Sequence, residues 1–410
     1  MKKLIELGLM AHVVSLFIFY NEESSIYIYI IGILTNFLLL LGIMKYQKKL
    51  AFTPVVVLHG AFTCLCVISI FYSIEPEESF KRSVVVLFTF INGVCWTSYI
   101  DSFDNIKKIL RYFVYGGLTL LLFLILTQDI SELTDRQRFG AGYINANYLG
   151  TMTAISCLFS SYLYLTERNL KWRVFYFVSA FILLGGLGLS GSRNSFLMFM
   201  VIIVFAVSNY PSSLKRKLKV VMSVLALVFT LYYFIADSNS VFSETVGNRI
   251  DGIINIIMGD GEIDLSVSAR LNMISFGLSI FADSILLGYG LDTFAYLYPA
   301  KHMYAHNNYI ELLVDLGFIG LVVHYALPIV IYVRLRKKLI NEPKRIDISM
   351  FLSLMAGIFI LGIGAVYYYW VQIIDIYVLA LAVTKLSHNN SNRYDEVTFD
   401  LNNQKRGSHP

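Results

Sequence analysis

The chain has 410 residues, of which 57% are hydrophobic and 15% are charged, and its mean hydropathy is +0.64. One soluble core needs far less apolar material, so the composition excludes a soluble globular protein and predicts a polytopic membrane protein. The formal net charge of +5 follows the expected membrane topology, so we expect no nucleic-acid partner.

Apolar runs of about 20 residues, long enough to cross a bilayer as an α-helix, recur along nearly the whole chain. Transmembrane β-strands would be alternating segments of about ten residues, so we predict an all-α fold. No small-residue cleavage site follows the first run, and we expect a retained first helix. About twelve spans are predicted, at residues 4–20, 26–44, 52–72, 82–100, 109–127, 147–165, 173–190, 195–209, 218–236, 308–333, 348–365 and 367–385.

Most lysines and arginines lie in alternate connections between these spans, starting with Lys2 and Lys3. The positive-inside rule places such connections in the cytoplasm, which predicts that both termini are cytoplasmic. A large external loop at 237–305 then separates the ninth and tenth spans. Within it, residues 270–287 have apolar positions at helical spacing, typical of a helix that lies on the membrane or over a cavity.

The predicted topology puts several arginines at the external face. Arg193, in GSRN at 191–194, interrupts apolar sequence that is too long for one span. A charge in this place is costly and indicates function, although the side chain could instead extend to lipid phosphates. Arg138 is either an anion contact or an ordinary loop residue, while Arg270 and the weaker candidate Arg249 stand beside apolar segments of the large loop.

The most distinctive stretch is YAHNNYIELLVDLGFIGL at 304–321, where His306 and Asn307 directly precede a long apolar segment. Asn308 and Glu311 have the spacing of a capping box, which predicts a helix start at Asn308. The free N–H groups of that helix end favour an anion and a neutral imidazole, and a neutral imidazole suits a general base. The alternative is an interfacial histidine held by a local hydrogen bond.

No ATP-binding loop, H-E-x-x-H motif or G-x-S-x-G elbow is found, so we expect no metal and no cofactor. Asp375 lies inside an apolar run and either pairs with a polar neighbour or marks a site. Several arginines and one histidine at one membrane face suit an anionic, membrane-anchored and already activated substrate. A lipid diphosphate fits, because guanidinium groups bind its oxygens and stabilise it as a leaving group.

These residues resemble the O-antigen ligase and polymerase superfamily, bacterial integral-membrane glycosyltransferases with a GT-C-like, all-helical fold. Asn194 departs from the family pattern, in which a small residue is more usual. The resemblance covers residues 138–321 and is carried by RFGAGYINANYLG at 138–150, SGSRN at 190–194, SARLN at 268–272, LLGYGLDTF at 286–294 and AHNNYIELLVDLGFIGL at 305–321.

The resemblance implies transfer of a glycan from an undecaprenyl-diphosphate carrier to an acceptor hydroxyl, with inversion, at the external face of the bacterial inner (plasma) membrane. It implies His306 as the base that deprotonates the acceptor and Arg193, Arg270 and Arg138 as diphosphate contacts. Asn307, Asn147 and Arg249 are expected to support them. The parts of the chain are then N-terminal scaffold and lipid-groove helices (1–127), central helices (128–236), the external loop (237–305), C-terminal helices (306–386) and a disordered cytoplasmic tail (387–410).

We predict a polymerase of O-antigen or capsular repeat units. One alternative is an O-antigen ligase of lipopolysaccharide synthesis, which shares the chemistry but uses lipid A-core as acceptor. The other is a non-catalytic flippase of lipid-linked glycans, which would be expected to line a central cavity with basic residues. The expected partners are the lipid-linked donor, a glycan or lipid A-core acceptor, membrane lipids and a chain-length regulator protein.

Overall fold

The computed structural model describes residues 1–20, 25–48, 51–127, 139–140, 143–209, 265–300 and 303–386. These residues form helices and turns without a β-strand, which confirms the predicted all-α fold for this part of the chain. Several predicted features lie outside the described residues, namely Arg138, Arg249, the ninth span at 218–236, residues 237–264 and 301–302 of the large loop, and the tail at 387–410.

Apart from the ninth, each predicted span coincides with a helix. The π-helical turn η1 continues directly into α3, and the short helix α12 lies in the connection before α13. The helices are α1 (Lys2–Ile18), α2 (Ser25–Lys45), η1 (Val55–His59), α3 (Gly60–Ser69), α4 (Pro76–Tyr99), α5 (Phe103–Thr127), α6 (Ala146–Thr166), α7 (Leu170–Ser190), α8 (Arg193–Asn209), α11 (Leu265–Phe281), α12 (Phe294–Leu297), α13 (Asn308–Asn341), α14 (Ile346–Leu361) and α15 (Val371–Lys385).

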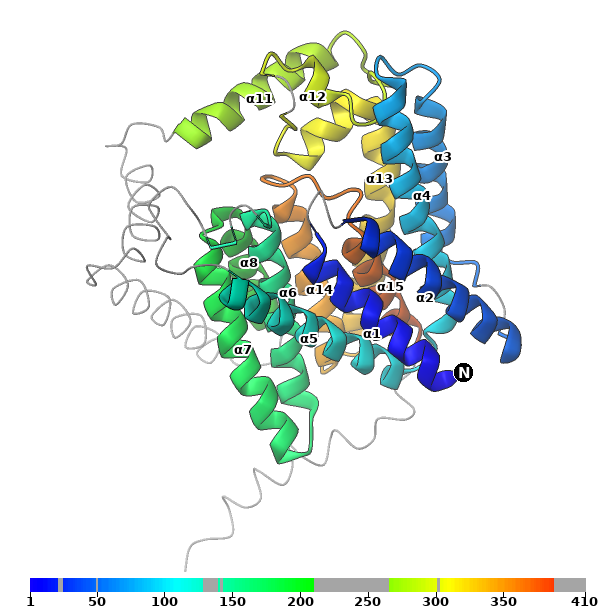
Figure 1. Cartoon of the computed structure of the whole chain (residues 1–410), viewed down its shortest axis with the longest axis vertical. Helices are drawn as coiled ribbons and strands as arrows, with labels where there is room; N and C mark the ends of the chain where they lie inside the picture. The colour runs from blue at the N-terminus through cyan, green and yellow to red at the C-terminus, as the bar shows by residue number, and fades with distance from the viewer. Residues whose placement is uncertain are drawn as a thin grey trace, which may run out of the picture.

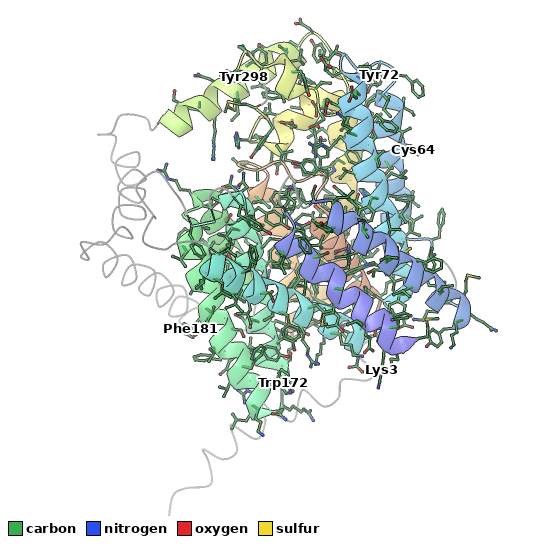
Figure 2. The ribbon with its side chains drawn as sticks, viewed as in Figure 1. Lys3, Cys64, Tyr72, Trp172, Phe181 and Tyr298 are labelled. Atoms are coloured by element: carbon green, nitrogen blue, oxygen red, sulfur yellow. The ribbon has the colours of Figure 1, made fainter. Side chains whose placement is uncertain are left out.

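Four of the described helices, α2, α5, α7 and α13, are long and apolar enough to cross a membrane. Shorter apolar helices cover 55–69, 193–209 and 346–361. Large apolar side chains point outward, for example Trp172 and Phe181 on α7 (Figure 2), which are about half exposed. Such an apolar surface suits a lipid surrounding. The count of twelve spans and the placement of the loops stay predictions.

The long helices pack as a bundle whose upper end, as drawn in Figure 1, is covered by α11 and α12. Helix α1 packs against α2 and α5, α6 against α7 and α8, and α14 against α8. Helix α11 packs on α13 and ends at Phe281, so the helix predicted over 270–287 is wrong in its last part, where residues 282–287 form turns and a bend. The beginnings of α6, α8 and α13 therefore share the end of the bundle that α11 covers.

Two glycines of the motif stretches allow the backbone before α12 to cross α13. Gly317 has φ +65 and interrupts α13, and a Cβ there would lie 2.3 Å from the carbonyl of Leu286. Gly288 has φ +68, and its Cβ would lie 2.4 Å from the carbonyl of Val314. Only glycine accepts this backbone conformation and this approach without strain. These glycines thus fix the segment that leads to the start of α13.

Candidate functional site

Three helix N-termini meet at the covered end of the bundle. The side chain of Asn145 accepts a hydrogen bond from the N–H of Asn147 at the start of α6 (2.8 Å), and Ser192 accepts from the N–H of Ser195 at the start of α8 (3.2 Å). Asn307 accepts from the first residues of α13, with 3.0 Å to the nitrogen of Tyr309. At α13 the N–H groups of Asn308, Tyr309 and Ile310 all have partners, so this helix end can favour an anion only through its dipole and not through free N–H groups. The meeting of three positive helix ends favours an anion.

Asn147 holds the start of α6 against the start of α8. Its side-chain oxygen accepts from the hydroxyl of Ser192 (2.7 Å), and its backbone carbonyl accepts from the hydroxyl of Ser195 (2.9 Å). Arg193 lies between these two serines as the first residue of α8 and is half-buried. Helix α7 ends at Ser190, so the break predicted at 191–194 is confirmed and places Arg193 at a helix N-terminus.

The end of α14 ties the three helix starts together. The carbonyls of residues 361–364 accept, in order, from the side chain of Asn194 (3.0 Å), the N–H of Asn308 (2.8 Å), the side chain of Asn307 (3.3 Å) and the side chain of Asn147 (3.4 Å). Leu361 is the last residue of α14 and residues 362–364 follow it, so these contacts hold the turn after α14 against the starts of α6, α8 and α13. Asn194, which departs from the family pattern, therefore has a structural role here.

The helix start predicted at Asn308 is confirmed, but the predicted capping box is wrong. The cap is Asn307, because the side chain of Asn308 is buried and engaged elsewhere. It donates to the hydroxyl of Tyr325 (2.9 Å) and accepts from the N–H of Tyr367 (2.8 Å). Glu311 accepts instead from the N–H of Ala305 (2.6 Å), which fixes the residue before His306.

His306 has an available ring nitrogen in a partly buried place. Its backbone adopts φ +52, a strained conformation for a residue with a side chain and one found preferentially at functional sites. Its ring contacts the ring of Tyr304, with 4.0 Å between centroids. Nδ1 is buried and has no hydrogen-bond partner among the described residues, which does not fit an interfacial histidine held through that nitrogen.

Burial, and next the positive charge of Arg270, lower the pKa of His306 to about 4. The imidazole is therefore neutral near pH 7, as expected for a general base. Arg270 also acts on the hydroxyl of Tyr304, whose pKa burial raises to about 12. Arg270 lies on α11, and the structure thus brings it together with His306 across the start of α13.

Two residues of this region were missed from the sequence. The side chain of Asn145 donates to the hydroxyl of Tyr304 (3.3 Å), which links the start of α6 to the His306 segment. Only their positions, Tyr304 two residues before His306 and Asn145 two before Asn147, could have indicated them.

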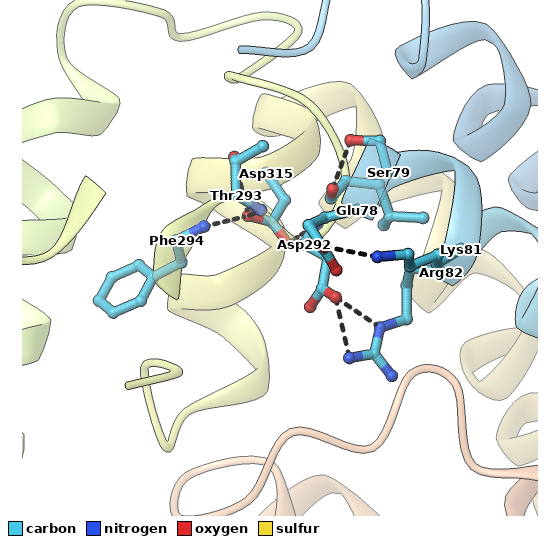
Figure 3. Close-up of polar contacts among 9 residues, drawn as sticks. Glu78, Ser79, Lys81, Arg82, Asp292, Thr293, Phe294 and Asp315 are labelled. Atoms are coloured by element: carbon cyan, nitrogen blue, oxygen red, sulfur yellow. Dashed lines mark hydrogen bonds and ion pairs between the residues drawn. The ribbon is translucent and has the colours of Figure 1, made fainter. Parts of the chain in front are cut away.

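The LDTF part of the motif is fixed by a buried carboxylate (Figure 3). Asp315 accepts from the N–H groups of Asp292 (2.8 Å), Thr293 (3.1 Å) and Phe294 (3.1 Å). Asp292 forms an ion pair with Arg82 of α4 at 2.9 Å. Charge-assisted hydrogen bonds of this kind are strong, so the loop before His306 is held to both α13 and α4.

Asp375, on α15, pairs with polar neighbours. The side chain of Asn92 donates to Oδ1 of Asp375 at 2.6 Å, and Nε2 of His12 is 3.9 Å from Oδ2. All three side chains are buried inside the bundle. Of the two alternatives for Asp375, pairing with a polar neighbour is therefore confirmed.

Comparison with known proteins gives a family match over part of the chain. Residues 178–325 match the family model described as O-antigen ligase (Wzy_C). This segment contains Arg193, Arg270 and His306 and ends inside α13. The comparison with curated proteins gives no match. Together with the apolar helices, the match over this segment is consistent with an integral membrane protein similar to O-antigen ligases.

Proposed function

We propose that the chain is a glycosyltransferase that polymerises undecaprenyl-diphosphate-linked repeat units, and the match of residues 178–325 to the O-antigen ligase family model supports this proposal. The product would be O-antigen or capsular polysaccharide at the external face of the bacterial inner membrane. The observation that carries this proposal is His306, a neutral imidazole with an unpartnered buried nitrogen, beside Arg270 and the meeting helix N-termini.

In the proposed reaction the donor diphosphate lies against the N-termini of α6, α8 and α13. Arg193 and Arg270 contact its oxygens, and His306 takes the proton of the acceptor hydroxyl. The hydroxyl oxygen forms a bond to the anomeric carbon of the donor sugar and inverts it. The bond from that carbon to the diphosphate breaks, and the diphosphate leaves with the electron pair. The arginines stabilise the charge that develops on it.

The low pKa of His306 makes the imidazole a weak base in the free protein, and binding of the donor would raise this pKa. A diphosphate bound beside the ring offsets the charge of Arg270 and favours the imidazolium. His306 thus becomes more basic when the leaving group is in place. Proton abstraction is then linked to donor binding.

The remaining assignments follow the same proposal. Arg138 is a further diphosphate contact and Arg249 supports it, while Asn147 and Asn307 position the site through the carbonyls of residues 361–364. Residues 1–127 form the scaffold and the lipid groove, and both termini are cytoplasmic. The arginines take the place of a divalent ion, so transfer by the purified protein should continue in excess EDTA. Loss of activity under that treatment would contradict this point.

Polymerase and ligase share this chemistry and differ in the acceptor, a lipid-linked repeat unit or lipid A-core. A flippase finds no support in the family match. A deletion strain separates the two enzymes, because loss of a polymerase leaves single repeat units on carrier or core. Accumulation of full-length carrier-linked chains in that strain would instead identify a ligase.

A further inference from the structure

A cavity of about 870 Å³ lies next to the candidate site and takes no part in the proposed diphosphate contacts. It is lined by the end of α1, the beginning of α2, Arg82 of α4, residues 143–145 before α6, and residues 369–372 at the start of α15. The predicted topology places all of these helix ends at the external face. The volume is in the range of sites for small organic ligands.

Aromatic rings make up much of the wall. Tyr20 is stacked on Tyr148 with 3.6 Å between ring centroids, and Trp370 meets Tyr20 edge-on at 5.9 Å. Tyr29 lines the wall from α2, with its ring packed at right angles against Phe88. Rings held in this way present fixed apolar faces with polar edges. A sugar ring has the matching surface, with C–H groups on its faces and hydroxyls around its rim.

The polar groups of the cavity suit an uncharged, hydroxyl-rich ligand. Asn145 offers an amide, and Gln372 offers its amide oxygen, because its amide nitrogen already donates to the hydroxyl of Tyr148. The guanidinium of Arg82 is already paired with Asp292 at 2.9 Å and lies 4.0 Å from the ring centre of Tyr369. A diphosphate would compete with Asp292 for that charge. A prenyl chain would bury the amides and the guanidinium without hydrogen bonds, which is costly. A carbohydrate would neither compete with Asp292 for the guanidinium nor leave the amides without hydrogen bonds.

Asn145 connects the cavity with the proposed base. It lines the cavity, and its side chain donates to the hydroxyl of Tyr304, whose ring contacts the ring of His306. A ligand in the cavity therefore approaches His306 from the side of the start of α6. The acceptor is the substrate whose hydroxyl must come to that base.

We propose that this cavity binds the sugar units of the acceptor glycan, with Tyr20, Tyr29 and Trp370 as the stacking surface and Asn145 and Gln372 as hydrogen-bonding groups. The assignment to the acceptor rests on the proposed transferase function. The assignment to carbohydrate rests on the cavity itself.

The test uses the purified full-length protein and the carrier-free repeat-unit oligosaccharide released by mild acid from the undecaprenyl-diphosphate-linked repeat unit of the producing strain. Binding is measured by saturation-transfer NMR with titration. Tyr29→Ala should weaken binding about three- to tenfold, the usual worth of one aromatic contact. Tyr27→Ala is the matched control, because Tyr27 is on the same helix, is half exposed and does not line the cavity. Tyr29→Leu, which keeps apolar bulk, guards against a folding defect.

The outcomes separate this proposal from the proposed function. His306→Ala should lower the transfer rate at least about a hundredfold and leave oligosaccharide binding unchanged. Tyr29→Ala should raise KM for the acceptor without changing KM for the donor. Equal binding by the Tyr29→Ala and Tyr27→Ala proteins would overturn the cavity assignment, as would displacement of the oligosaccharide by undecaprenyl phosphate. A raised KM for the donor alone would overturn the acceptor assignment. The wild-type protein could bind the oligosaccharide more tightly than Tyr29→Ala and yet show no transferase activity. That result would refute the proposed function but still support the carbohydrate site.

Discussion

Arg270→Gln should raise the pKa of His306 and move the acid limb of the rate profile to higher pH. In the free protein this pKa lies at about 4, below the ordinary 6.5, with burial as the larger cause and the charge of Arg270 as the next. Removing the charge of Arg270 leaves burial as the remaining cause of the low pKa. The pKa should therefore move upward from about 4 by less than half of the interval to 6.5.

The sign of the effect on rate follows from the role of His306 as a base. The imidazole must be neutral to accept a proton, so kcat/KM falls as the pH drops through the pKa of the free protein. The wild-type limb is expected near pH 4 and the Arg270→Gln limb above it. The limb in kcat should lie higher than the limb in kcat/KM, because bound diphosphate raises the pKa of the complex.

The assay is transfer by the purified protein at several pH values, together with NMR titration of the His306 ring. Arg270→Lys is the matched control, since it keeps the positive charge and should leave the limb in place. The absolute rate falls in any variant that loses a diphosphate contact, but the position of the limb reports only the base. A wild-type limb near 6.5, or an identical limb in wild type and Arg270→Gln, would refute the reasoning.

Three further changes test other parts of the account. Asn307→Ala removes the cap of α13 and should lower the free energy of unfolding by about 1 kcal/mol, measured by chemical unfolding in detergent, while Asn307→Asp should keep most of it. Gly317→Ala should lower the melting temperature and the activity, because its Cβ would meet the backbone of Leu286, whereas Gly188→Ala, with nothing within 4 Å, should be tolerated; equal behaviour would contradict the backbone crossing. Arg193→Gln should reduce kcat/KM at least about tenfold and Arg193→Lys less, measured by transfer from a lipid-linked donor, and unchanged rates in Arg193→Gln would remove this residue from the diphosphate contacts.

The positions of the helices could be predicted because the signal is local. An apolar run of the right length, or an interruption such as Gly191 to Arg193, states where a membrane helix begins and ends without reference to the rest of the chain. The helix start at Asn308 was predicted on the same basis. The N-cap is Asn307 and not the predicted Asn308, because Tyr325 and Tyr367, far along the chain, engage the side chain of Asn308.

The arrangement of the site could be predicted only in part. The sequence indicated that His306, Arg193 and Arg270 belong to one face. It did not indicate that the four successive carbonyls of residues 361–364, at the end of α14, accept hydrogen bonds from Asn194, Asn308, Asn307 and Asn147. The aromatic cavity could not be predicted either, since its wall comes from segments more than 300 residues apart in the sequence. Such contacts depend on tertiary packing, which no local pattern encodes.

The most direct test of the central claim is single-turnover transfer by His306→Ala. The account predicts a rate at least about a hundredfold below wild type, the usual effect of losing a general base, with donor binding retained. Tyr304→Phe keeps the neighbouring ring and the imidazole, so its rate should stay much closer to wild type. Wild-type transfer by His306→Ala, at a normal level of folded protein, would contradict the claim that His306 is the base.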